Sequence, residues 1–276
     1  MKDLFGKSTE ELRNKKLFLF DMDGTINYDN QLFEGVTELL HTIEELGGTY
    51  MFITNNSSKS VDDYIKKVRA MGIDADVNCF LTSAQATVLY LREEYEDKKV
   101  YVIGTKSFQE ELINGGVTLV SPEEAEVLLV GYDTELTYEK WVNACKILYT
   151  SDAPFIATNP DLCCPTAFGY IPDCGSICNA IAATTKKDPV YIGKPKPTMV
   201  NLAMELHGYE KEDTVVIGDR LYTDIACGIN AGVTTVCVMT GEATKKEIEE
   251  SDIKPTITLN NVKEMYEILS VVSEMN

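Results

Sequence analysis

The sequence LFLFDMDGT, residues 17–25, decides the fold and carries the first sign of chemistry. Its four leading apolar residues predict a short buried strand, and its closing Gly24-Thr25 predicts a tight turn. Asp21 and Asp23 lie between the two, at i and i+2. Two carboxylates at such short range repel each other unless a cation lies between them or one is protonated. The stretch therefore predicts a metal-assisted reaction centre at the carboxyl end of a strand.

The overall composition limits the partners of the chain. Its 276 residues, 44% hydrophobic and 25% charged, suffice for one or two globular domains. Residues 1–16 lack the apolar segment of a secretory signal, and no stretch approaches the ~18 apolar residues of a membrane span. A net charge of −19 argues against nucleic acid and anionic membranes as partners. Without an export signal the eight cysteines should stay reduced, so we expect a cytoplasmic protein.

Strand and helix patterns alternate along almost the whole chain. Residues 34–46 carry apolar side chains at helical spacing, and a helix over 60–71 is expected to start with Ser60 and Asp63 as a partial capping box. Further strand patterns occur at residues 49–54, 99–103, 127–130, 155–157, 190–192, 213–217 and 233–239. Short apolar strands separated by helices predict an α/β protein with a doubly wound, mostly parallel sheet.

Polar residues directly follow four of these strands. The four blocks are Asp21-x-Asp23, Thr54-Asn55, Gly193-Lys194-Pro195, and a late block with Asp219 and Asp224. Because the carboxyl ends of parallel strands share one edge of a sheet, blocks far apart in sequence can form one site. Carboxylate oxygens favour Mg²⁺ over zinc, and the two histidines of the chain lie outside the blocks.

This set of residues suits phosphoryl transfer. A cation and Lys194 would neutralise phosphate oxygens, Thr54 and Asn55 would hold them, and one carboxylate would attack in line. A second carboxyl two residues later would protonate the leaving oxygen and then activate water. Positive charge concentrated at Lys194 would let this acidic chain bind an anion, so we expect a small phosphorylated metabolite as its partner.

The four blocks, in this order, resemble the signature motifs of phosphatases of the haloacid dehalogenase superfamily. Thr158-Asn159-Pro160-Asp161, Cys174-Gly175-Ser176 and Gly193-Lys194-Pro195 together resemble its NagD-like, or 4-nitrophenylphosphatase-like, branch. The resemblance covers nearly the whole chain. It implies a Mg²⁺-dependent phosphatase that hydrolyses nucleotide, sugar or aryl phosphate monoesters through an aspartyl-phosphate intermediate. It leaves the substrate open and allows a homo-oligomer.

The resemblance also implies roles for the acidic residues of the blocks. Asp21 would be the nucleophile and a Mg²⁺ ligand. Asp23 would be the general acid/base and would bind Mg²⁺ through its backbone carbonyl. Asp219 would complete the metal shell, and Asp224 would brace it from behind.

The resemblance assigns phosphate and substrate contacts to other residues. Thr54 and Asn55 would hold the transferring phosphate, and Lys194 would stabilise its charge. In this branch an α/β cap domain is inserted into the catalytic core and covers the substrate. Asn159 and Asp161 are the cap residues expected to reach inward to the substrate.

The length of the insertion sets the expected domain boundaries. We place the cap at residues 83–174, and the catalytic core at residues 1–82 and 175–276 on either side. Specificity is expected to depend on the cap, which is the part of the sequence with the fewest recognisable motifs.

Three other functions remain open at this point. A phosphotransferase or mutase would use the same aspartyl-phosphate but return the phosphoryl group to a sugar. A receiver-like phospho-acceptor protein also gathers Asp, Thr or Ser, and Lys at strand ends, although receivers are single domains of ~120 residues. A catalytically silent binding protein on the same fold would not need every motif residue, and here all are present.

Several conspicuous residues have simpler explanations. Arg220 and Tyr222 are expected at the surface in the first turn after a strand, with contact to the substrate or the cap as the alternative. Cys174 and Cys178 lack the second ligand pair of a zinc site, so we expect buried thiols on a helix. The acidic run 242–250 is expected to be the solvated face of a helix.

Overall fold

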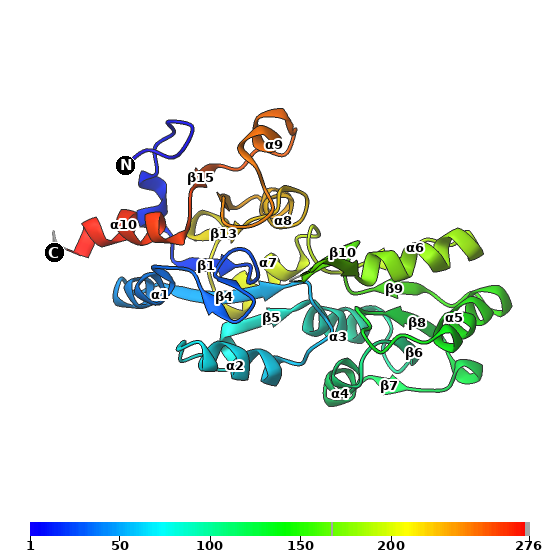
Figure 1. Cartoon of the computed structure of the whole chain (residues 1–276). Helices are drawn as coiled ribbons and strands as arrows, with labels where there is room; N and C mark the ends of the chain where they lie inside the picture. Colours follow the sequence, from blue (N-terminus) through cyan, green and yellow to red (C-terminus); the bar gives the residue numbers. More distant parts are fainter. Residues whose placement is uncertain (167, 274–276) are drawn as a thin grey trace. The chain divides into compact units, whose positions relative to one another are not determined.

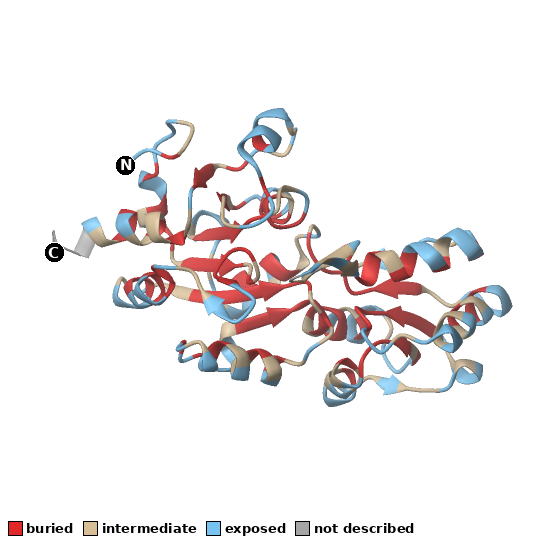
Figure 2. Cartoon of the chain, viewed as in Figure 1, coloured by how far each residue is buried: buried red, intermediate tan, exposed pale blue. Residues whose placement is uncertain are grey.

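The computed structural model describes residues 1–166 and 168–273, and it divides into two compact units. The first unit comprises Met1–Thr54, Ile65–Leu81 and Lys194–Asn276, and the second comprises Asn55–Tyr64 and Thr82–Gly193. Figure 1 follows the elements of both along the chain. The strands at the centre of each unit are buried, whereas the helices alternate between buried and exposed residues (Figure 2).

The first unit is built on a six-stranded sheet with the order β15-β14-β13-β1-β4-β5. β1 lies between β13 and β4 and runs parallel to both. Because the strand order reverses there, the carboxyl end of β1 is a topological switch point, where open α/β sheets bind ligands. The elements of this sheet and its surroundings are β1 (Leu17–Phe20), β2 (Asn27–Tyr28), β3 (Gln31–Leu32), α1 (Val36–Glu45), β4 (Thr49–Thr54), α2 (Val61–Ala70), β5 (Phe80–Thr82), α7 (Thr198–His207), β13 (Thr214–Gly218), α8 (Ala226–Ala231), β14 (Thr234–Val238), α9 (Lys245–Glu250), β15 (Ile257–Leu259) and α10 (Val262–Ser273).

The second unit has its own parallel sheet of five strands, in the order β12-β9-β8-β6-β7. An antiparallel hairpin of β10 and β11 precedes its last helix. Apolar strands and amphipathic helices build this unit as they build the first. Its elements are α3 (Ser83–Glu94), β6 (Lys99–Ile103), α4 (Lys106–Asn114), β7 (Thr118–Leu119), β8 (Val127–Val130), α5 (Tyr138–Thr150), β9 (Phe155–Ala157), β10 (Cys163–Thr166), β11 (Gly169–Pro172), α6 (Cys174–Thr185) and β12 (Val190–Tyr191).

The structure confirms the predicted α/β class and its parallel sheets. It also confirms the cap of α2: the N–H of Ser60 donates to Oδ2 of Asp63 at 3.1 Å, and the N–H of Asp63 donates to Oγ of Ser60 at 3.3 Å. These reciprocal bonds satisfy two N–H groups that the first turn of a helix leaves without a partner.

Residues 175–193 belong to the second unit, whereas the sequence placed them in the catalytic core. β12 pairs with β9 in the second sheet, and α6 buries Ile177 and Ile181 in the apolar core of that unit. Cys174 and Cys178 are buried on α6 as expected, and all eight cysteines are free thiols. The amphipathic pattern of α6 identifies a helix but does not reveal which sheet it covers.

None of the helices within residues 1–166 and 168–273 has the length and apolarity of a membrane span.

Candidate functional site

β1 delivers Asp21 to the switch point of the first sheet. All four residues of β1 are buried, and the N–H of Asp21 still donates to the carbonyl of Ile217 on β13, at 2.8 Å. The chain then turns sharply, and the N–H of Gly24 donates to the carbonyl of Asn27 at 2.8 Å. Gly24 has a φ of +93°, and a Cβ there would lie 2.7 Å from Oδ2 of Asp219. Glycine is therefore needed where the turn after β1 meets the carboxylate after β13.

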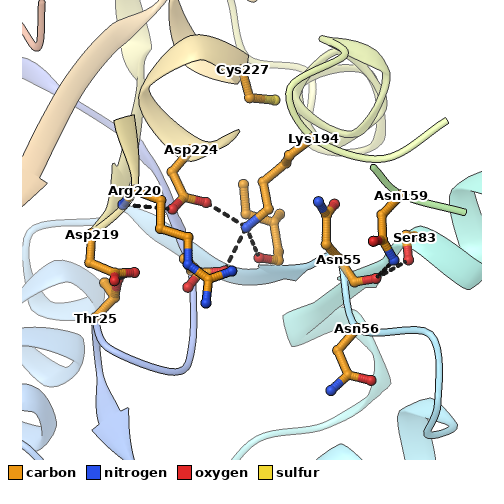
Figure 3. A network of polar contacts seen from close by, with 12 residues as sticks. Thr25, Asn55, Asn56, Ser83, Asn159, Lys194, Asp219, Arg220, Asp224 and Cys227 are labelled. Atoms are coloured by element: carbon orange, nitrogen blue, oxygen red, sulfur yellow. Dashed lines mark hydrogen bonds and ion pairs between the residues drawn. The ribbon is translucent and has the colours of Figure 1, made fainter. Parts of the chain in front are cut away.

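Lys194 joins two carboxylates of the first unit (Figure 3). Its Nζ donates to Oδ1 of Asp21 and to Oδ1 of Asp224, both at 2.6 Å, and to the carbonyl of Ile53 at 3.0 Å. Lys194 is only 1% exposed. A buried charge is stable when it is paired and hydrogen-bonded, and these three acceptors match the three ammonium protons. The bonds fix the ammonium directly beside Asp21.

Asp21, Asp219 and Asp224 form what we call the carboxylate cluster, because one oxygen of each lies within 4.8 Å of the other two. Asp219 follows β13, and its Oδ2 accepts from the N–H of Glu242 at 2.8 Å. Asp224 lies in the helical turn after β13, and its Oδ2 accepts from the N–H of Arg220 at 3.2 Å. Hard oxygen donors gathered in this way suit Mg²⁺.

The surroundings of the carboxylate cluster raise the pKa of two of its members, Asp219 and Asp21. Burial raises the pKa of Asp219 to about 6, and the charge of Asp224 adds to the rise. Burial also raises the pKa of Asp21, although Lys194 opposes that rise. Burial alone would lower the pKa of Lys194, but the carboxylates of Asp21 and Asp224 outweigh it and raise that pKa. Buried carboxylates that repel one another provide a favourable environment for a divalent cation.

Arg220 lies beside the carboxylate cluster, so the expectation of a surface position was wrong for this residue. Its side chain is 17% exposed, and its Nε lies 3.0 Å from Oε2 of Glu242. Burial would lower the pKa of Arg220, but the carboxylates of Asp21 and Asp219 contribute to a net rise. Tyr222 is 47% exposed, as expected. Position in the turn after a strand does not predict which way a long side chain folds.

Asp23, the second carboxylate of the opening stretch, contacts a different lysine. Its Oδ1 accepts from Nζ of Lys67 at 2.9 Å and from Nδ2 of Asn27 at 2.7 Å. Neither donor was predicted from the sequence. Lys67 is one of two adjacent lysines in a helical pattern, and such a pattern does not indicate a contact with Asp23. Asn27 follows Asp23 by four residues across the predicted turn, which is a weak indication that the two side chains meet.

The other predicted site residues divide between the two units. Thr54 is buried at the end of β4, the neighbour of β1 in the first unit. In the second unit, Nδ2 of Asn159 and Oγ of Ser83 both donate to the carbonyl of Asn55, at 2.7 and 2.6 Å (Figure 3). Nδ2 of Asn55 donates to Oδ2 of Asp161 at 3.1 Å. The structure thus groups Asn55, Asn159 and Asp161 in one buried network.

Known proteins with similar sequences and structures span nearly the whole chain. Residues 18–118 match the family described as haloacid dehalogenase-like hydrolase, and residues 191–265 match one described as HAD-hydrolase-like. The acid sugar phosphatase of Staphylococcus saprophyticus is 33% identical over 258 residues, 94% of this chain and 99% of that protein. The 4-nitrophenylphosphatase from Thermotoga maritima is 35% identical with a TM-score of 0.90, covering 94% of this chain and 99% of that one. NagD from E. coli K-12 is 32% identical with a TM-score of 0.83, covering 91% and 98%.

Proposed function

This chain belongs to the haloacid dehalogenase superfamily, in its NagD-like branch of phosphoric monoester hydrolases, and from this premise we propose that it hydrolyses small phosphate monoesters through an aspartyl-phosphate on Asp21. One observation carries the proposal: the ammonium of Lys194 bonds Asp21 directly, within a cluster completed by Asp219 and Asp224. Phosphoryl transfer depends on positioning and charge stabilisation, which a fixed cation and a fixed carboxylate at a sheet switch point can supply.

Two proton transfers by Asp23 complete the proposed reaction. The carboxylate of Asp21 attacks phosphorus, the bond to the leaving oxygen breaks, and Asp23 gives that oxygen a proton. Asp23, now a carboxylate, then takes a proton from water. The water attacks the aspartyl-phosphate, inorganic phosphate leaves, and Asp21 is restored. Lys194 stays paired with negative charge throughout and so stabilises both transition states.

The residues present fit a divalent cation. Asp21 and Asp219 would hold Mg²⁺ through side-chain oxygens, and Asp23 would hold it through its backbone carbonyl. Asp224 would brace the site, because its two oxygens already accept from Lys194 and from the backbone of Arg220. The supporting observations are the hard oxygen donors and the raised pKa of Asp219 and of Asp21. When bound, Mg²⁺ would neutralise phosphate oxygens and favour the ionised form of Asp21.

Small polar groups at and directly after the end of β4 would hold the phosphate. Thr54 would hold it in the first unit, and Asn55 follows Thr54 directly in the chain. Asn159 and Asp161, which we expected to contact the substrate, would instead act through Asn55, because each bonds it. A buried amide already engaged in this way is suited to orienting its neighbour.

The proposed substrates are sugar, aryl or nucleotide phosphates. Two relatives are named for a sugar phosphatase and a 4-nitrophenylphosphatase activity. The eight free thiols suit a reducing compartment, so we place the reaction in the cytoplasm.

A phosphate-release screen tests the proposal. The purified protein is assayed on 4-nitrophenyl phosphate and on a panel of sugar and nucleotide phosphates, with Mg²⁺ and with excess EDTA. We expect turnover that EDTA removes and added Mg²⁺ restores. No Mg²⁺-dependent release from any substrate would contradict the proposal. Recovery of the phosphoryl group on a second sugar, in place of inorganic phosphate, would instead favour the phosphotransferase.

A further inference from the structure

We propose that Lys67 and Asn27 are positioning residues for the general acid/base: they hold Oδ1 of Asp23, so that Oδ2 exchanges the proton with the leaving group and water. The inference rests on the proposed role of Asp23 and goes beyond it by naming the oxygen that reacts and the groups that aim it. All three residues belong to the first unit.

Two donors converge on one oxygen of Asp23. Nζ of Lys67 donates to Oδ1 at 2.9 Å, and Nδ2 of Asn27 donates to the same atom at 2.7 Å. A carboxylate oxygen that accepts two strong donors is poorly placed to take part in proton transfer. The other oxygen, Oδ2, then carries the reactive lone pair in a direction that the two donors determine.

Lys67 differs from an ordinary surface lysine. Its side chain is 14% exposed, whereas that of Asp23 is 44% exposed. Exposed ion pairs contribute little because two mobile side chains must be ordered together. Here the low exposure of Lys67 on α2 restricts its side chain before the ion pair forms. The ammonium of Lys67 can therefore orient the more exposed carboxylate of Asp23.

Asn27 is a second fixed point, built on the turn after β1. It is completely buried at the start of β2, and its carbonyl accepts the N–H of Gly24. Its Nδ2 donates both to Asp23 and to the carbonyl of Asp29, the latter at 2.9 Å, which sets the orientation of the amide. Among the described residues, its own Oδ1 has no hydrogen-bond partner. A buried acceptor without a partner lowers stability. The buried position of Asn27 is therefore better explained by the bonds that its Nδ2 donates to Asp23 and Asp29.

The two proposed catalytic carboxylates are held in the same way. Lys194 bonds one oxygen of Asp21, and Lys67 bonds one oxygen of Asp23. In each case a lysine distant in sequence occupies one oxygen and leaves the other for the reaction. Asp21 would use its second oxygen to form the bond to phosphorus, and Asp23 would use its second oxygen to move a proton.

The dependence of turnover on the leaving group distinguishes two roles for Lys67 and Asn27. If they orient Asp23 for proton transfer, their loss should matter most for leaving groups that need a proton, whereas a purely structural role should affect all substrates equally. We compare 4-nitrophenyl phosphate, whose leaving group needs little protonation, with a sugar phosphate that the unsubstituted protein hydrolyses. Lys67→Met and Asn27→Leu should each lower kcat on the sugar phosphate about tenfold or more, with KM unchanged. The loss on 4-nitrophenyl phosphate should be about threefold at most. Lys67→Arg should restore part of the loss, and Lys66→Met, which alters the exposed neighbour on α2, should behave as the unsubstituted protein.

A double-mutant cycle completes the test. Adding Lys67→Met to Asp23→Asn should cause no further loss on the sugar phosphate, because the group that Lys67 aims is already gone. Equal losses on both substrates, no loss on the sugar phosphate, or additive losses in the double variant would each overturn the positioning role. If Asp23→Asn itself shows no leaving-group dependence, the acid role fails and the inference fails with it. Should Lys67→Met unfold, Lys67→Gln and Asn27→Leu decide the question.

Discussion

The sheets of the two units are both parallel and both end in buried polar side chains, but they balance charge differently. In the first unit the carboxylate cluster gathers three acidic groups around Lys194. In the second unit Asp133 follows β8, and its fully buried side chain pairs with Lys140 at 2.6 Å. Nearby, the hydroxyls of Thr158 and Ser57 hydrogen-bond each other at 2.9 Å without any charge.

The contrast shows that two parallel sheets of similar build can balance buried charge in different ways. One carboxylate that faces one ammonium has its charge matched, and removing either partner leaves an uncompensated buried charge. Several carboxylates that share an ammonium keep an affinity for a further cation and for the phosphate that such a cation would bring. We therefore expect substitutions in the first unit to change mainly turnover and substitutions in the second unit to change mainly stability. Four substitutions test this expectation.

Asp21→Asn should have the largest effect. It keeps the size and position of the side chain but removes the proposed nucleophile, so we expect turnover of 4-nitrophenyl phosphate to fall about 10⁴-fold or more. Circular dichroism should show an unchanged fold. Residual turnover within tenfold of the unsubstituted protein would place the nucleophile elsewhere.

Lys194→Met should come next. It leaves the buried carboxylates of Asp21 and Asp224 without their ammonium, so kcat should fall about 100-fold or more, and the variant should unfold at a lower temperature. Added Mg²⁺ should raise its melting temperature more than that of the unsubstituted protein, because the cation would replace part of the missing charge. Lys196→Met, at an exposed position in the same loop, is the control. A variant with unchanged kcat would remove Lys194 from the reaction.

Lys140→Met tests the other side of the comparison. It leaves Asp133 buried without its partner, and urea denaturation should show a loss of about 2–3 kcal/mol in the free energy of unfolding. The kcat on 4-nitrophenyl phosphate should be unchanged. Lys146→Met removes an exposed pair with Glu123 and should leave the free energy of unfolding nearly unchanged. A large loss of kcat at unchanged stability would mean that the charge of the second unit also takes part in the reaction.

Glu111 should have the smallest effect, and one that depends on pH. Burial raises the pKa of this carboxyl to about 6, and its Oε2 accepts the N–H of Val61 at 3.1 Å. The folded protein therefore holds the proton more tightly than the unfolded chain. The resulting stability is complete below the ordinary pKa of 4.5 and is lost as the pH rises through about 6.

Glu111→Gln should remove that pH dependence. Relative to the unsubstituted protein, its free energy of unfolding should improve by about 2 kcal/mol at most between about pH 4 and about pH 7. Urea denaturation at both pH values measures the difference. A constant difference across this range would contradict the assigned cause.

Much of the first unit could be predicted from the sequence because its determinants are local or topological. Four apolar residues before Asp21 specify a buried strand, and parallel strand ends share an edge. Asp21 and Asp219 were therefore expected to meet, although nearly two hundred residues separate them in the chain, and the structure places both in the carboxylate cluster. Lys194 was expected beside Asp21 for the same reason.

What could not be predicted depends on contacts that one sequence does not encode locally. The pattern of α6 is equally compatible with either sheet, so the boundary at residue 174 could not be placed from it. Arg220 and Lys67 are long side chains whose direction depends on the packing around them. The bonds of Asn159 to Asn55 likewise depend on two segments that only the folded unit brings together.

The glycine at position 24 has a consequence for anyone who wishes to diversify this enzyme. Any side chain there would enter the space of the Asp219 carboxylate, and a side chain at Gly241 would collide with the same group. The backbone therefore packs closely around the carboxylate of Asp219, and it can do so because neither Gly24 nor Gly241 carries a side chain. Libraries aimed at new substrates should therefore hold both glycines constant.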